Sequence, residues 1–340
     1  MTLDHGWLDL TEEEALEPAL PICDPHHHFW DKRESPFYRS PRYLLDELLA
    51  DTGAGHNIVS TVFIECRSMY RASGPEPMRP VGETEFVNGI AAMAASGLYG
   101  PTRIAAGIIG FANLRLGAAV RPVLEAHLAA GGGRFRGIRH SASWDPSDGV
   151  RNAACDPPRG MYAEADFRAG FAHLAPLGLS FEAWLYHPQI PELAALARAF
   201  PETTIILDHF GGPLGIGPYA GKRDEVFATW KADIAELAKL PNVHAKLGGL
   251  QMDVNGFGWH EHARPPGSQA LAAATAPYHE HCIERFGVRR CLFESNFPVD
   301  NLSCSYTVLW NSFKRIAAGC SPGEKASLFH DTAARLYRLG

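Results

Sequence analysis

The chain has 340 residues, of which 46% are hydrophobic and 20% are charged, and its formal net charge at pH 7 is -7. This composition is typical of a globular protein and excludes an intrinsically disordered chain. The negative charge, without a basic stripe, argues against a nucleic-acid-binding protein. The length favours about two domains, or one α/β barrel, which commonly exceeds about 250 residues.

Cysteine spacing and the N-terminal segment indicate the compartment. The seven cysteines are scattered without C-x-x-C spacing, which argues against a disulfide framework or a structural zinc knuckle. The first residues, MTLDHGWLDLTEEEALEPAL, are acidic and lack the layout of a signal peptide. No apolar run reaches the roughly 18 residues of a membrane span. We therefore predict a cytoplasmic protein that acts on a small-molecule substrate, independent of membranes; whether it forms a homo-oligomer stays open.

Short β-branched runs alternate with Ala- and Leu-rich stretches of helical spacing along the chain. The predicted strands are Ile22–His28, Ile58–Glu65, Ile104–Gly110, Phe135–Ser141, Leu179–Tyr186, Thr204–His209, Val243–Leu247 and Cys291–Asn296. The predicted helices are Tyr43–Thr52, Glu83–Ser96, Leu116–Ala130, Ala165–Ala175, Ile190–Ala199, Asp224–Lys239, Ala270–Phe286, Ser303–Ala318 and Pro322–Leu336. Eight strands, each followed by a helix, are typical of a (β/α)8 TIM barrel, predicted here for residues 21–340 after an N-terminal arm at 1–20. The alternative, a doubly wound open sheet, normally carries a G-x-G-x-x-G turn that is missing after the first strand.

The connections between these elements are of two kinds. The helix-to-strand connections are short and contain Pro or Gly, whereas long strand-to-helix connections occupy Cys66–Pro80, Ala142–Glu164, Gly211–Arg223 and Gly248–Gly267. In a barrel the strand-to-helix loops form the face that carries the active site. We therefore predict a single domain with its site on that face.

The first predicted strand ends in the run Asp24-Pro-His-His-His-Phe-Trp-Asp31. Side chains two residues apart on a strand point to the same side, so His26 and His28 are predicted to face the barrel axis. Two converging imidazoles can hold a divalent cation or orient a substrate oxygen. The alternative is a His-rich turn capped by Asp24.

This run resembles the first-strand H-x-H motif of the amidohydrolase superfamily, in its amidohydrolase-2 or lactonase-like branch. The segments L-D-H-F-G-G-P, ending at Pro213, and E-S-N-F-P-V-D, ending at Asp300, resemble that branch's sixth- and eighth-strand segments, so the resemblance covers nearly the whole chain. It implies a TIM-barrel hydrolase similar to sugar lactonases and pyrone-dicarboxylate lactonase. It also implies one divalent metal ion, with Zn²⁺ favoured and a metal-free mechanism as the alternative, on His26, His28 and His187.

Polar residues also end the other predicted strands. His209 is predicted to polarise the scissile carbonyl or to carry a proton, because its ordinary pKa lies near 6.5. Arg139 presents a planar fork that suits a substrate carboxylate, with a structural salt bridge as the alternative. Tyr186 and His187 point opposite ways on a regular strand, so only one of them faces the axis. The remaining predicted substrate-binding residues are Glu65, Trp184, Tyr186 and Lys246.

The eighth-strand segment departs from the family pattern. The resemblance places a general-base Asp in an S-D-x-P context, but the matching residue here is Asn296, whose neutral amide cannot take a proton from water. Asp300 either replaces that base or caps the final helices, a role that Ser303 also suits. Activation of water by His209 or by a metal is the other alternative. A two-metal site is not predicted, because Arg139 or His140 lies where some members carry a carbamylated lysine.

Three functions follow from these observations. The favoured one is hydrolysis of a small carboxylate-bearing or sugar-derived lactone. The first alternative is a lyase of the same superfamily, a decarboxylase or hydratase acting on an aromatic-catabolite acid, with which Asn296 is compatible. The second alternative is a catalytically inactive barrel that binds a ligand.

Overall fold

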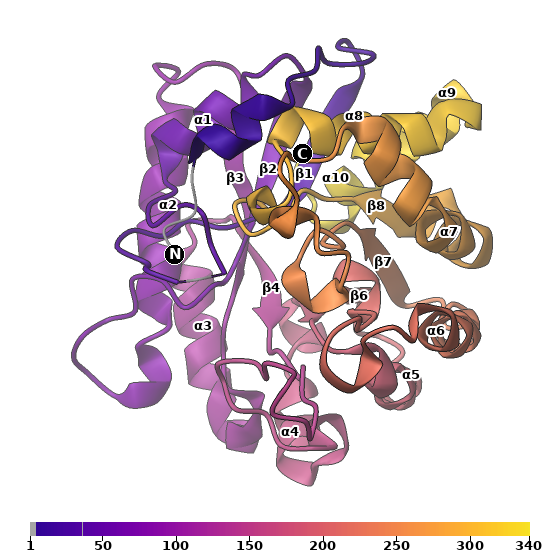
Figure 1. Cartoon of the computed structure of the whole chain (residues 1–340). Helices are drawn as coiled ribbons and strands as arrows, with labels where there is room; N and C mark the ends of the chain where they lie inside the picture. Colours follow the sequence, from indigo (N-terminus) through magenta and orange to yellow (C-terminus); the bar gives the residue numbers. More distant parts are fainter. Residues whose placement is uncertain (1–4, 36) are drawn as a thin grey trace.

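Eight parallel strands follow one another in chain order around the structure, a computed structural model that describes residues 5–35 and 37–340 (Figure 1). The strands are β1 (Pro21–His27), β2 (Asn57–Ile64), β3 (Arg103–Gly110), β4 (Phe135–Arg139), β5 (Ser180–Ala183), β6 (Ile205–Leu207), β7 (Val243–Leu247) and β8 (Cys291–Phe293). Each strand pairs with the next in parallel. Past the end of β8, a bridge pairs His27 with Phe297, and the His28 amide donates to the Phe297 carbonyl at 2.8 Å. The sheet is a nearly closed barrel, so the predicted (β/α)8 fold is confirmed and the open-sheet alternative is wrong.

Helices lie outside the strands and connect them (Figure 1). Between consecutive strands lie α1 (Leu45–Thr52), α2 (Val81–Ala95), α3 (Arg121–Ala130), α4 (Ala165–Phe171), α5 (Ile190–Ala199), α6 (Arg223–Leu237) and α7 (Ser268–Phe286). After β8 come α8 (Tyr306–Ile316), α9 (Pro322–Ala326) and α10 (Thr332–Leu336), with a π-helical turn at Ser327–Asp331 between the last two. Among the described residues, none of the helices combines the length and apolar character that crossing a membrane requires.

Six strands end one to three residues earlier than their sequence patterns predict. The ends that bear most on the site are those of β5 at Ala183, β6 at Leu207 and β8 at Phe293, and β1, β2 and β4 also end early. Near the ends of β6 and β8 the backbone turns sharply, with φ of 52° at His209 and 55° at Asn296. Left-handed residues cannot continue a strand, so the chain leaves the sheet where the site residues begin.

Strand alternation separates an apolar outer layer from a charged barrel centre. On β5, Phe181 faces outward, and its ring centroid lies 6.1 Å from that of Phe167 and 5.0 Å from that of Phe171 on α4. The next residue, Glu182, points the other way, and its Oε2 lies 2.7 Å from Lys246 Nζ on β7. The apolar core therefore lies between strands and helices, while the barrel centre beneath the predicted site holds ionisable groups.

The described part of the predicted N-terminal arm packs against the outer helices. The Leu16 amide donates to Asn311 Oδ1 on α8 at 2.8 Å, and Lys314 Nζ donates to the Leu16 carbonyl at 2.7 Å. Glu13 Oε1 accepts from the Ser268 amide at the start of α7, at 2.7 Å. These contacts place the arm outside the barrel; its first four residues lie outside the described part of the chain.

Candidate active site

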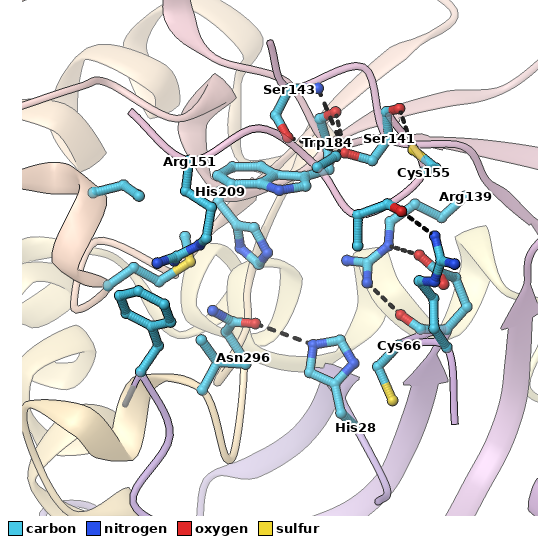
Figure 2. Close-up of a pocket in the computed structure, with 18 of the residues that line it drawn as sticks. His28, Cys66, Arg139, Ser141, Ser143, Arg151, Cys155, Trp184, His209 and Asn296 are labelled. Carbon is cyan, nitrogen blue, oxygen red and sulfur yellow. Dashed lines mark hydrogen bonds and ion pairs between the residues drawn. The ribbon is translucent and has the colours of Figure 1, made fainter. Parts of the chain in front are cut away.

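A cavity of about 260 Å³ opens where the strands end, on the side of the long strand-to-helix loops (Figure 2). This volume is slightly below the usual range for pockets that bind drug-sized molecules, so it suits a small ligand. The predicted site residues that line the cavity are His28, Glu65, Arg139, Trp184, Tyr186, His209 and Asn296. They come from six different strand ends, which places the cavity at the face that carries chemistry in TIM barrels.

One buried carboxylate contacts two histidines just below the cavity. Glu294, the first residue after β8, has Oε2 at 2.7 Å from His26 Nδ1 and Oε1 at 2.7 Å from His209 Nδ1. The two imidazole centroids are 4.4 Å apart. We call His26, His209 and Glu294 the catalytic cluster. His209 lines the cavity, whereas His26 and Glu294 lie behind it and are fully buried.

Lys246 stands beneath this cluster with two further carboxylates. Its Nζ lies 2.7 Å from Glu182 Oε2 and 3.4 Å from Asp208 Oδ1. Lys246 is fully buried and does not line the cavity, so the structure does not place it in contact with a ligand there. The structure gives Lys246 ionic partners inside the barrel, and its substrate-binding role stays a prediction.

The charges of this ionic network are set by burial and by its neighbours. Burial alone would lower the pKa of Lys246, but Glu182, Asp208 and Glu294 raise it above its ordinary value. Burial would raise the pKa of Asp208, but Lys246 and its other neighbours hold that pKa well below the usual range. Burial outweighs Lys246 at Glu182, whose pKa is well above its ordinary value. Lys246 and Asp208 are therefore a fixed ion pair, while Glu182 tends toward its neutral form.

The guanidinium of Arg139 is hydrogen-bonded to other residues of the protein. Its Nε donates to Glu65 Oε1 at 2.9 Å, and a second N–H donates to the Glu65 main-chain carbonyl. Nη1 lies 3.2 Å from His26 Nε2. Since a guanidinium only donates, His26 Nε2 accepts this hydrogen bond, while Nδ1 lies 2.7 Å from Glu294 Oε2 and 3.3 Å from Lys246 Nζ. The structural salt bridge, given above as the alternative for Arg139, is present.

His28 and Asn296 lie next to each other in the wall of the cavity (Figure 2). His28 faces the same side as His26, as predicted, with ring centroids 4.9 Å apart. Its Nδ1 donates to the Ile64 carbonyl at 2.8 Å, and Nε2 lies 3.3 Å from Asn296 Oδ1. Burial lowers the pKa of both His26 and His28 well below the ordinary value, so both rings are neutral.

Asp300 lies behind Asn296. It is fully buried, does not line the cavity, and accepts a hydrogen bond from Asn296 Nδ2 at 2.8 Å. Burial raises the pKa of Asp300 well above its ordinary value. The predicted capping role is wrong for both Asp300 and Ser303, because the cap of α8 is Ser305, whose hydroxyl accepts from the Val308 amide. Asp300 thus holds Asn296 in place and does not face the cavity as a free carboxylate.

His187 is the predicted metal ligand that the structure places elsewhere. Its Nδ1 accepts from the Leu214 amide at 3.3 Å, and its ring packs on Tyr219, in a separate outer cavity. Trp184 and Tyr186 line the site cavity, and because the backbone at Tyr186 is extended, the following residue points away from that cavity. A metal site built from His26, His28 and His187 is therefore not formed.

The residues present nevertheless fit a divalent cation at the catalytic cluster. The potential ligand atoms of His26, His209 and Glu294 all lie within 4.8 Å of one another. Both carboxylate oxygens of Asp208 and Oε2 of Glu294 are buried without a hydrogen-bond donor. Even with Glu182 in its neutral form, the buried carboxylates Glu65, Asp208 and Glu294 outnumber the buried cations Arg139 and Lys246. A cation balances this excess of negative charge.

Glu294, Asp208 and Glu182 were not singled out from the sequence. Asp208 stands in the L-D-H-F-G-G-P segment directly before His209, so the motif itself carried the signal. Glu294 directly follows the apolar run Cys291-Leu-Phe293, and its position at the end of that strand was the signal for a carboxylate at the site.

Comparison with known proteins agrees with this geometry. The amidohydrolase family model matches residues 23–339. The uncharacterized protein y4mH of Sinorhizobium fredii is 34% identical, over 94% of this chain and 99% of that one, and L-fucono-1,5-lactonase of Burkholderia multivorans is 26% identical, over 93% and 95%. Crystal structures of an amidohydrolase from Burkholderia multivorans, one with HEPES and one with zinc bound, superpose with a TM-score of 0.72 at 25% identity, over 94% of this chain and 99% of that one. The chain belongs to the amidohydrolase family.

Proposed function

We propose that the protein is a hydrolase that opens a small lactone at the catalytic cluster. The observation that carries the proposal is the contact of Glu294 with both His26 and His209, at the edge of a cavity sized for a small ring. The likeness to L-fucono-1,5-lactonase supports the same class of reaction. Aromatic walls that include Trp30, Trp184 and Tyr186 suit the flat face of such a ring.

In ring opening, His209 moves a proton and Glu294 orients His209. Water adds to the lactone carbonyl carbon, the ring C–O bond breaks, and the proton lost by water ends on the alcohol oxygen, so the product is a hydroxy acid. His209 projects into the cavity (Figure 2), and Glu294 occupies its Nδ1, which leaves Nε2 to carry that proton. Glu294 orients His209 in the way that a carboxylate orients the histidine of a hydrolytic triad.

A metal would use the same residues. His26, His209 and Glu294 would hold one divalent cation, Zn²⁺ in our proposal, which when bound supplies Lewis-acid polarisation of the substrate carbonyl. In that form His209 Nε2 carries a fixed proton toward the cavity and stabilises negative charge on the substrate as a hydrogen-bond donor.

A lyase is the second candidate, and Asn296 favours it, since the general-base Asp of the family pattern is replaced. Glu294 weakens that argument, because this residue, two positions earlier in the sequence, brings a carboxylate to the same histidines. The inactive barrel is disfavoured by the same contact, since a buried carboxylate held against two histidines beside a cavity is an arrangement typical of catalytic sites.

Turnover of a panel of lactones and aromatic acids tests the proposal. The panel contains sugar lactones, pyrone carboxylates and hydroxybenzoates, and the readouts are acid release, CO₂ release and loss of the conjugated chromophore. We expect acid release from at least one lactone without CO₂. Release of CO₂ from an aromatic acid in place of lactone opening assigns the lyase, and binding seen by calorimetry without turnover assigns the inactive barrel.

A further inference from the structure

Four arginines line the site cavity, and their partners divide them into two pairs. Arg139 is ion-paired with Glu65, and Arg151 with Asp253, where Nη2 lies 3.1 Å from Oδ1. Arg33 and Arg67 have no carboxylate within ion-pair distance among the residues that the structure describes. The second pair therefore brings positive charge to the cavity that no acid of the described chain balances.

Neutral acceptors hold Arg33 and Arg67 at one side of the cavity. Arg33 follows β1, and its Nη2 donates to the Cys66 carbonyl at 2.6 Å. Arg67 follows β2, and one N–H donates to the Ala154 carbonyl in the loop after β4. Each guanidinium has five N–H donors, and these contacts take one of them. Because Cys66 directly precedes Arg67, the two residues belong to the same edge of the cavity.

The positive charges of Arg33 and Arg67 lie at one edge of the cavity, and negatively charged groups lie behind it. Glu294 and Asp208 stand behind the cavity and repel an anion from the catalytic cluster. Arg33 and Arg67 attract it to the loops after β1 and β2. An anionic substrate is thus oriented with its charge on these loops and its remaining part toward His209.

We propose that Arg33 and Arg67 bind a carboxylate of the substrate, so that the preferred lactone is an acid and not a neutral sugar lactone. This inference rests on the proposed function for the reaction, but its binding step is independent of it. A planar guanidinium matches a carboxylate through two parallel hydrogen bonds, which a lysine cannot supply. The aromatic rings beside them, with Arg33 4.6 Å above the Trp30 ring, restrict the ligand to a flat shape.

Coumalate, a pyrone carboxylate, and its primary amide test the inference, because they have nearly the same shape, while the amide lacks the negative charge and one of the two acceptor oxygens. For the wild-type protein we expect kcat/KM for coumalate to exceed that for the amide by about 10- to 100-fold. Arg67→Met is expected to remove most of this preference by raising KM for coumalate, with KM for the amide and both kcat values little changed. Arg33→Met is expected to act in the same direction.

Arg79→Met is the matched control. Arg79 is exposed on the same loop as Arg67, donates from Nε to the Gly74 carbonyl at 3.4 Å, and does not line the cavity. Its loss changes the net charge equally, so it reports any effect of overall charge on substrate attraction. We expect the preference for coumalate to survive in this variant.

Calorimetry with the same two compounds separates failure of this inference from failure of the proposed reaction. One possible outcome is that neither compound is turned over, that the wild-type protein binds coumalate more tightly than the amide, and that Arg67→Met abolishes this difference. That outcome supports the carboxylate site and contradicts the proposed hydrolysis. Equal rates and equal affinities for the two compounds in the wild-type protein contradict the inference, as does an equal loss for both compounds in Arg67→Met. If inorganic phosphate competes with coumalate more strongly than acetate does, Arg33 and Arg67 bind a phosphate group, and the proposed carboxylate site is wrong.

Discussion

Glu294→Gln is expected to lower kcat for lactone opening by about 10³- to 10⁴-fold, the scale seen when the orienting carboxylate of a hydrolytic triad becomes an amide. The carboxylate accepts a hydrogen bond from His209 Nδ1 on Oε1, and its Oε2 lies 2.7 Å from His26 Nδ1, so it contacts both rings at the same time. A glutamine amide accepts on one oxygen only, so it turns an N–H donor toward one of the two rings. One histidine then loses its orientation or its tautomer, and the proton carrier no longer faces the substrate in the right form.

The measurement is kcat with the best lactone of the panel, together with melting temperature and elemental analysis of protein purified without chelator. If a metal is bound, we expect about one equivalent in the wild-type protein and a smaller amount in Glu294→Gln, because an amide oxygen is a weaker ligand than a carboxylate. Glu125→Gln, which removes an exposed partner of Arg121, is the control and should match the wild type. A kcat for Glu294→Gln within tenfold of the wild type would place the reaction centre elsewhere.

His209→Ala is expected to lower kcat/KM by about 10²- to 10⁴-fold, the usual contribution of a residue that carries a proton. The ring lies at the cavity wall with its centroid 4.9 Å from that of Trp184, so its removal enlarges an existing cavity and does not open the apolar core. The loss of melting temperature should therefore be small compared with the loss of rate.

His127→Ala is the control for this comparison. His127 is also fully buried, but it bonds Thr84 Oγ1 and the Phe111 carbonyl and does not line the cavity. Its removal should lower the melting temperature and leave most of the rate. The opposite pattern, in which His209→Ala destabilises the fold and retains its rate, would make His209 a structural histidine.

Local patterns were sufficient to predict the barrel. Alternation between β-branched runs and helical spacing placed all eight strands, and the rule that residues two apart share a side placed His26 and His28 together. The same rule separated Tyr186 from His187. These predictions succeeded because strand periodicity is a property of neighbouring residues and needs no knowledge of distant ones.

Contacts between distant strands were beyond the sequence. His26 lies on β1, while His209 and Glu294 follow β6 and β8, and nothing in their spacing gives the depth at which each side chain meets the others. Arg139 had a plausible role as a free guanidinium until its partner on β2 was known. The left-handed backbone at His209 and Asn296, which ends the strands early, belongs to the same class of feature, because tertiary contacts and not local preference stabilise it.

The most direct test of the account is the fate of oxygen when the protein acts in water enriched in heavy oxygen. Opening of a lactone by water predicts one heavy oxygen atom in the carboxylate of the hydroxy acid, detected by mass spectrometry, no release of CO₂, and formation of this labelled product about 10³-fold or more slowly in Glu294→Gln. A product that carries no heavy oxygen in its carboxylate, or carries it on a former double bond, or forms together with CO₂, would contradict hydrolysis at the catalytic cluster.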